Sequence, residues 1–219
     1  MSVDGPRAQS ATRRMMHALA AISCLSLLGA SSRSAAAQSF DVQRLGYDRG
    51  NPAAPIAIIE FGDFGCSACA IFFRDTYPQL QREFISTGLV KWKYVPFILG
   101  SFPNSGAATR AAECAADQDA FWSMHDLLYR RQKEWNRVLR PAGPMPKFAG
   151  ELGLDSARFR ECYDKDLGGA RTRQANDTAR ELMVRVTPTF FINGRRAVGA
   201  LTIDQWRRLL GDLDAARQH

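Results

Sequence analysis

The most informative part of this 219-residue chain reads Ile56-Ala57-Ile58-Ile59-Glu60-Phe61-Gly62-Asp63-Phe64-Gly65-Cys66-Ser67-Ala68-Cys69. Its first six residues are an apolar run typical of a buried strand, and Ile71-Phe72-Phe73 continues with helical character. A CxxC pair between a strand and a helix places the first sulfur at a helix N-terminus. The backbone N–H groups and the positive end of the helix dipole stabilise a thiolate there. The stretch therefore indicates either a redox centre or half of a metal site at Cys66 and Cys69.

The elements predicted around this stretch follow the order β-α-β, a block of helices, then β-β-α. The strand at 56–61, the helix at 66–86 and the strand at 89–95 favour a parallel pair with a right-handed crossover. Asn193-Gly194 is a strong signal for a hairpin turn. The remaining predictions are helices at 107–118, 121–132, 155–163, 170–184 and 202–213, strands at 189–192 and 195–198, and loops at 38–55 and 141–146.

Residues 1–37 have the pattern of a cleaved signal peptide. Arg13-Arg14 is a basic start, residues 15–30 are apolar, and Ala35-Ala36-Ala37 offers a cleavage site. The apolar stretch is shorter than the roughly 20 residues of a membrane span, so cleavage is favoured over a membrane anchor. We therefore expect export to the periplasm, with lipid attachment at Cys24 and twin-arginine export as alternatives.

The charge of the chain argues against nucleic acid as a partner. The formal net charge is +7, of which +3 lies in residues 1–37, so the rest of the chain carries only a mild excess of positive charge. No basic run alternates with aromatic residues, as segments that bind nucleic acid often do. With 46% hydrophobic residues, the chain is long enough for one well-packed domain with a sub-domain.

Four cysteines remain once residues 1–37 are removed: Cys66, Cys69, Cys114 and Cys162. Disulfides persist in an oxidising compartment, and an even number fits two pairs. A structural zinc site would need a second close pair, and Cys114 and Cys162 are far apart in the sequence. We therefore expect no metal, no cofactor and a structural disulfide between Cys114 and Cys162. Such a bridge adds about 4 kcal/mol of stability on the chain-entropy model, and two buried free thiols are the alternative.

Three segments resemble the thioredoxin superfamily. They are the strand and CxxC turn at 58–69, the loop and hairpin Val186-Thr187-Pro188-Thr189-Phe190-Phe191-Ile192-Asn193-Gly194, and the helical Ala111-Ala112-Glu113-Cys114-Ala115 followed by Phe121-Trp122. The helical block is similar to that of the DsbA-like branch, and the resemblance covers about residues 53–213. It implies an α/β thioredoxin fold with a helical domain inserted between the βαβ and ββα halves. The expected domains are 1–37, the signal peptide; 38–98 and 185–219, the two halves of the thioredoxin domain; and 99–184, the inserted helices.

The resemblance implies an exported thiol-disulfide oxidoreductase that donates disulfides to exported proteins. A mixed disulfide would form at Cys66 and be resolved by Cys69 or by a substrate thiol. The expected partners are reduced or unfolded exported proteins and a membrane protein that reoxidises the CxxC pair. We expect a monomer, because isomerases of this superfamily dimerise through an N-terminal domain for which too few residues precede the first strand.

Two other functions stay open at this point. Ser67-Ala68 departs from the proline-containing dipeptides of DsbA-like oxidases and thioredoxins, and this dipeptide affects how strongly the thiolate is stabilised. A reductase of disulfides or sulfenic acids is therefore one alternative. A binding or chaperone module with a structural CxxC pair is the other, and it predicts that Cys66→Ser leaves function intact.

The resemblance also implies roles for residues near the cysteines. Glu60 would be a buried acid beneath the CxxC pair, with a raised pKa, able to take a proton from Cys69. Pro188 would follow a cis peptide bond, and Thr187 would present its backbone to a substrate that adds as a strand.

Aromatic and histidine side chains complete the candidates. Phe64, in the turn before Cys66, is predicted to be exposed and to contact substrate. Core packing is the favoured reading for Phe72, Phe73 and Phe97, and His125 is predicted to lie at the surface of a helix.

Overall fold

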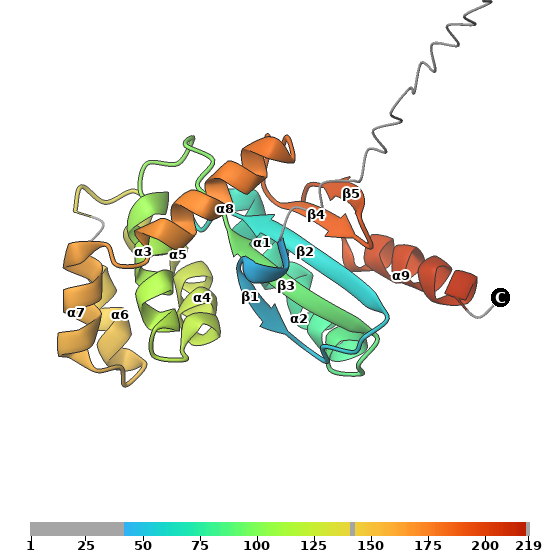
Figure 1. The fold of residues 1–219 in the computed structure, drawn as a ribbon, viewed down its shortest axis with the longest axis horizontal. Coiled ribbons are helices and arrows are strands. Elements are labelled where there is room, and N and C mark those ends of the chain that lie inside the picture. Colours follow the sequence, from blue (N-terminus) through green and yellow to red (C-terminus); the bar gives the residue numbers. More distant parts are fainter. Residues whose placement is uncertain (1–41, 141–142, 218–219) are drawn as a thin grey trace, which may run out of the picture. The chain divides into compact units, whose positions relative to one another are not determined.

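The computed structural model describes residues 42–140 and 143–217 (Figure 1). The predicted signal peptide at 1–37, Cys24 included, lies outside the described residues. Within the described part of the chain, no helix is long and apolar enough to cross a membrane.

The described residues form a five-stranded sheet with the strand order β1-β3-β2-β4-β5. Strands β2 and β3 are parallel, as predicted, with Ile56 opposite Val90. Strand β4 runs antiparallel to β2, with Glu60 opposite Phe190, and β5 completes the hairpin. The strands are β1 (Tyr47–Arg49), β2 (Ile56–Gly62), β3 (Val90–Pro96), β4 (Thr189–Ile192) and β5 (Arg195–Val198).

The prediction of a loop at 38–55 is wrong in part, because strand β1 lies within it. Its three residues pair antiparallel with β3, and Tyr47 lies opposite Tyr94. A three-residue edge strand that contains Asp48 and Arg49 has no alternating apolar pattern, so periodicity does not reveal it. The strand is defined by its hydrogen bonds to β3, which form only when the sheet is assembled.

The helix predicted at 66–86 is divided into three pieces. Helix α1 (Ser67–Asp75) ends before a short helix α2 (Tyr77–Leu80), and a π-helical turn, Gln81–Ile85, follows. Pro78 lies in the first turn of α2, where a missing N–H leaves no hydrogen bond unmade. The proline therefore begins a new helix.

Six helices connect β3 to β4, and we refer to them as the helical insertion. They are α3 (Ser105–Ala116), α4 (Phe121–Arg130), α5 (Gln132–Trp135), α6 (Pro144–Glu151), α7 (Ser156–Lys165) and α8 (Gly169–Glu181). The carboxylate of Asp155 accepts from the N–H groups of Ala157 and Arg158 and caps α7, as predicted. The predicted loop at 141–146 is wrong at its end, because α6 begins at Pro144. Helix α9 (Ile203–Arg217) closes the chain.

The core lies on both faces of the sheet. On one face, Phe72 of α1 and Trp206 of α9 pack against Trp92 and Phe190. On the other face, Ala175 and other residues of α8 pack against β2 and β3. A third cluster joins the CxxC segment to α3 and α4. Each fully buried large apolar side chain contributes about 1.5–3 kcal/mol, so these clusters fix the active-site turn in place.

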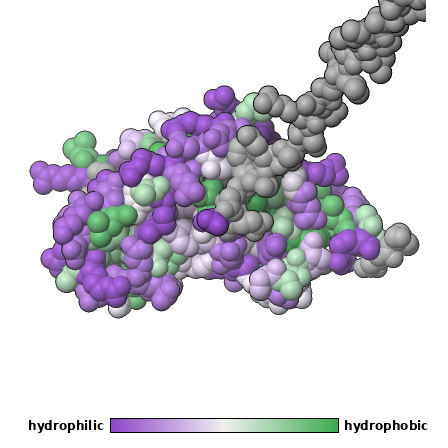
Figure 2. Space-filling view, viewed as in Figure 1, coloured by the Kyte–Doolittle hydropathy of each residue, from purple (hydrophilic) through white to green (hydrophobic). Residues whose placement is uncertain are grey.

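The face seen in Figure 2 is mostly hydrophilic over the helices of the insertion. This agrees with amphipathic helices that bury one stripe and leave charged positions in water. The insertion therefore presents a solvated outer surface on this face.

Candidate active site

Cys66 lies at the N-terminus of α1, as the strand–CxxC–helix order predicts. It is the N-cap residue, and its Sγ accepts a hydrogen bond from the backbone N–H of Cys69 over 3.4 Å. In its protonated form, its thiol also donates to the backbone carbonyl of Thr187 over 3.3 Å. Cys66 and Cys69 are both free thiols.

The two thiols differ in how easily they ionise. A hydrogen bond from the Cys69 side chain lowers the pKa of Cys66 to about 6, and the N–H groups of Cys69 and Ala68 act in the same direction. Burial raises the pKa of Cys69 well above its ordinary value. At neutral pH, Cys66 is therefore the thiolate and Cys69 holds its proton.

Glu60 lies on β2, the strand that leads into the CxxC turn. Only 4% of the residue is exposed, and burial raises the pKa of its carboxyl to about 8. Negative charge at Glu60 also raises the pKa of Cys69. The structure thus places a carboxyl that is protonated at neutral pH beside the buried thiol, where the resemblance leads us to expect an acid.

The loop before β4 lies against the cysteines. The peptide bond between Thr187 and Pro188 is cis. The hydroxyl of Thr189 donates to the carbonyl of Val186 over 2.7 Å and fixes this loop. The contact from Cys66 to the Thr187 carbonyl shows that residues 121 positions apart meet at the site.

The prediction for Phe64 is wrong. Its side chain is fully buried, with ring centroids 5.5 Å from Tyr94 and 5.2 Å from Tyr129. Tyr129 belongs to α4 of the helical insertion, which packs against the CxxC turn. Phe64 is therefore part of the core beneath the active site and has no exposed surface for substrate.

The prediction for His125 is also wrong, since only 3% of it is exposed. It shares the apolar stripe of α4 with Phe121, Met124 and Leu128, at the spacing of one helix face. Its ring centroid is 4.5 Å from that of Tyr94, and its Nδ1 lies 2.8 Å from a carboxylate oxygen of Asp126. Burial lowers the pKa of His125, so the ring packs as a neutral group.

Asp63 is a site residue that sequence reasoning missed. Its buried carboxylate accepts from the N–H of Gly65 over 2.8 Å, from the N–H of Leu99 over 2.9 Å and from the hydroxyl of Ser105. These bonds join the CxxC turn to the start of the helical insertion. A second acid in the apolar segment, three residues after Glu60 and three before Cys66, was the available signal.

Gly65 is required where the turn meets the insertion. A Cβ at this position would lie 2.4 Å from the Ser105 hydroxyl oxygen and 2.7 Å from the Cβ of Phe102. The close approach that holds Asp63 and Ser105 together therefore excludes any larger residue.

Two amides of the insertion hold the backbone of the CxxC turn. Nε2 of Gln132 donates to the carbonyls of Phe64 and Cys66 over 2.6 and 3.0 Å. Nδ2 of Asn136 donates to the carbonyl of Gly65 over 2.9 Å. The insertion thereby positions the reactive cysteine, although it contributes no thiol to the site.

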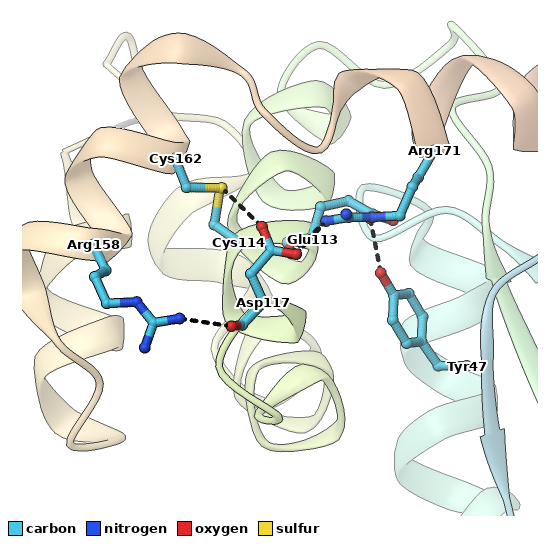
Figure 3. A network of polar contacts seen from close by, with 7 residues as sticks. All are labelled: Tyr47, Glu113, Cys114, Asp117, Arg158, Cys162 and Arg171. Atoms are coloured by element: carbon cyan, nitrogen blue, oxygen red, sulfur yellow. Dashed lines mark hydrogen bonds and ion pairs between the residues drawn. A yellow bond between two sulfur atoms is a disulfide. The ribbon is translucent and has the colours of Figure 1, made fainter.

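The predicted disulfide between Cys114 and Cys162 is confirmed, with the two Cα atoms 5.7 Å apart. It joins α3 to α7, away from the CxxC pair. Beside it, Arg171 pairs with Glu113 and Asp117, and the Tyr47 hydroxyl donates to Glu113 over 2.7 Å (Figure 3). This network ties α3 and α8 to strand β1.

Among the described residues, no group of three or more His, Cys, Asp or Glu side chains is arranged to hold a metal ion.

Comparison with known proteins places this site in a family. A thioredoxin family model matches residues 46–212. Disulfide bond formation protein D of Bacillus subtilis is 27% identical over 156 residues, which make up 67% of each chain. The Na(+)/H(+) antiporter NhaA 3 of Salinispora tropica is 38% identical over 158 residues, or 71% of this chain. The chain spans only 23% of that antiporter's length, so the similarity concerns one part of it.

Solved structures share the fold. BdbD from Bacillus subtilis superimposes with a TM-score of 0.68 at 24% identity, covering 75% of this chain and 90% of that one. DsbA from Chlamydia trachomatis gives a TM-score of 0.69 at 21% identity, covering 79% and 93%. The expected α/β thioredoxin fold, with helices between its two halves, is thereby confirmed.

Proposed function

This chain belongs to the thioredoxin family, and we propose that it is an exported thiol-disulfide oxidoreductase that donates disulfides to other exported proteins. Its structural neighbours are DsbA-like proteins, and its Bacillus relatives are named disulfide bond formation protein D. The observation that carries the proposal is the difference in ionisation between Cys66 and Cys69.

A thiolate held at Cys66 makes the disulfide oxidising. Stabilising the thiolate stabilises the reduced form of the pair, and so favours transfer of the disulfide to a substrate. The low pKa of Cys66, about 6, also makes its sulfur a good leaving group.

The reaction starts from the Cys66–Cys69 disulfide. A substrate thiolate attacks Sγ of Cys66, the bond to Cys69 breaks, and the Cys69 thiolate takes up a proton. A second substrate thiolate then attacks the substrate sulfur of the mixed disulfide and releases Cys66 as a thiolate. The substrate loses two electrons and gains a disulfide, while the CxxC pair gains two electrons.

Glu60 supplies the proton for the first step. The pKa of its carboxyl, raised by burial to about 8, keeps it protonated at neutral pH. The thiolate that leaves at Cys69 is buried, where an unpaired charge is costly. Proton transfer from Glu60 to Cys69 removes that charge, and the reverse transfer assists reoxidation.

The cellular setting is part of the proposal. The signal-peptide pattern at 1–37 supports export, and the Cys114–Cys162 disulfide fits an oxidising compartment. A disulfide donor that turns over needs an electron acceptor, so we include a quinone-linked membrane oxidase as partner. We propose that the protein acts as a monomer in the periplasm.

A reductase is the second candidate. The reactive cysteine of a strongly oxidising protein has a pKa of about 3.5, and that of thioredoxin has a pKa of about 7. The pKa of Cys66, about 6, lies between these two values. Ser67-Ala68 is the feature that keeps this alternative open. A structural CxxC pair is less compatible with one activated thiol and one protonated thiol in the same turn.

A single-turnover experiment tests the function. Oxidised protein is mixed with a reduced peptide that contains two cysteines, and both are analysed by mass spectrometry after acid quenching. We expect the peptide to lose two hydrogens and the protein to gain two, in equal amounts. The Cys66→Ser variant should leave the peptide reduced. A wild-type protein that stays oxidised beside a reduced peptide would overturn the proposal.

A further inference from the structure

A hollow of about 710 Å³ adjoins the CxxC turn, and we call it the Arg137 pocket. Its walls are Gly65 and Ser67, the loop at 101–104 that follows β3, and the segment at 136–139 that follows α5. Gly65 and Ser67 are the chain neighbours of Cys66. The pocket therefore borders the turn that carries Cys66, although Cys66 itself does not line it.

The walls of the pocket are fixed by hydrogen bonds. Nδ2 of Asn104 donates to the carbonyls of Trp135 and Val138 over 2.8 and 3.0 Å, which joins the two loops. Asn136 donates to the carbonyl of Gly65 and ties the second loop to the turn. The pocket is thus positioned relative to Cys66 by the same bonds that hold the active site.

The pocket has a positive character. Among the described residues that line it, Arg137 is the only charged one, and no carboxylate of the described chain forms an ion pair with it. The bordering segment at 130–140 contains five basic residues and a single acid, Glu134. Glu134 already pairs with Arg131, so the segment has a surplus of positive charge next to the CxxC turn.

The rim of the pocket is apolar. Leu139 is fully exposed and Val138 is more than one third exposed. Phe102 and Pro103 line the opposite wall. Arginine beside exposed aliphatic groups suits a peptide segment that carries a carboxylate together with apolar side chains.

We propose that the Arg137 pocket receives the substrate segment next to the cysteine that bonds to Cys66, and that Arg137 selects substrates with an acidic residue there. The inference rests on the proposed function, because that function puts a polypeptide on the Cys66 sulfur. The contact with Thr187 occupies one side of this sulfur, and the Arg137 pocket adjoins the turn that carries it.

The test uses three reduced two-cysteine peptides that differ only in the residue beside one cysteine: Glu, Gln or Lys. Each rate of oxidation by the protein is divided by the rate at which the same peptide reduces a small uncharged disulfide. This division removes the effect of the neighbouring charge on the peptide thiol. Proteins compared are the wild type, Arg137→Glu and the control Arg160→Glu, an exposed change of equal charge on α7.

The wild type should oxidise the Glu peptide about two- to five-fold faster than the Lys peptide, the range for an exposed ion pair. The Gln peptide should fall between them, and added salt should reduce the difference. Arg137→Glu should reverse the order, and Arg160→Glu should keep it. Equal normalised rates for all three peptides with the wild type would overturn the role of Arg137 and leave the function standing. Failure to oxidise any peptide would instead overturn the function itself.

Discussion

The backbone N–H of Cys69 donates to the Sγ of Cys66 over 3.4 Å, so the first turn of α1 holds the reactive sulfur. A hydrogen bond from the thiol of Cys69 lowers the pKa of Cys66 to about 6, and this N–H contact acts in the same direction. The buried Cys69 behaves in the opposite way. One turn of helix thereby makes two chemically different thiols from two identical residues.

The first prediction concerns this ionisation. Ultraviolet absorbance of the reduced protein should show a thiolate transition at about pH 6. Cys66→Ser should abolish the transition, because the pKa of Cys69 lies well above its ordinary value. A wild-type transition at or above the pKa of a free thiol, about 8.5, would contradict the assignment of Cys66 as the activated sulfur.

The second prediction concerns Glu60 and pH. Burial raises the pKa of this carboxyl from 4.5 to about 8, so its neutral form is favoured in the folded protein. The stability that goes with this shift is complete below pH 4.5, falls steadily as pH rises from there, and is gone above about pH 8. Glu60→Gln cannot ionise, and should be more stable than wild type by about 3 kcal/mol at pH 7, but not at pH 4.

Urea unfolding of both reduced proteins at several pH values provides the measurement. Glu181→Gln, an exposed change at the end of α8, is the control for loss of a carboxylate. A Glu60→Gln stability difference that does not change between pH 4 and pH 7 would show that the carboxyl is not protonated in the folded protein.

The third prediction concerns Asp63. Asp63→Ala removes the acceptor for the N–H groups of Gly65 and Leu99 and for the Ser105 hydroxyl. Leaving these donors unpaired should cost on the order of 3 kcal/mol. Because the same bonds position the CxxC turn, the thiolate transition of Cys66 should also move to higher pH.

Asp63→Asn retains one acceptor oxygen, so it should give smaller changes in both properties. Asp212→Ala, an exposed change on α9, should affect neither. If Asp63→Ala lowers stability but leaves the Cys66 transition in place, the residue supports the fold without positioning the thiolate.

The fourth prediction concerns the Cys114–Cys162 disulfide. It spans 48 residues of sequence and lies outside the CxxC turn. The double variant Cys114→Ala/Cys162→Ala should lose about 4 kcal/mol of stability on the chain-entropy model. Its Cys66 transition should stay near pH 6, measured by the same absorbance titration. A shift of more than one pH unit would show that the bridge influences the active site.

Much of the fold can be predicted from sequence patterns that span only a few residues. The strands β2 to β5 and the cap at Asp155 were predictable because apolar runs, Asn193-Gly194 and a capping side chain each act over a few residues. The CxxC pair was predictable for the same reason: its helix N-terminus is encoded within one turn of chain.

The rest depends on contacts between distant segments. Gln132 reaches the carbonyl of Cys66 across 66 residues, and no periodicity reveals that an amide in a polar segment holds the active-site turn. Phe64 was misplaced because the helical insertion packs over it, and His125 because its helix α4 turns that side of the insertion toward Phe64. Local sequence pattern does not show where the insertion packs. Strand β1 is defined only by its pairing with β3.

The most direct test of the central claim is the redox equilibrium of the Cys66–Cys69 pair with glutathione. The mature protein is incubated at pH 7 in buffers of varied ratio of reduced to oxidised glutathione, and the reduced fraction is measured after alkylation. A disulfide donor with a stabilised Cys66 thiolate should be half reduced at a potential above about −200 mV. A midpoint at or below about −270 mV, the value of thioredoxin, would contradict the claim and identify the pair as a reductant.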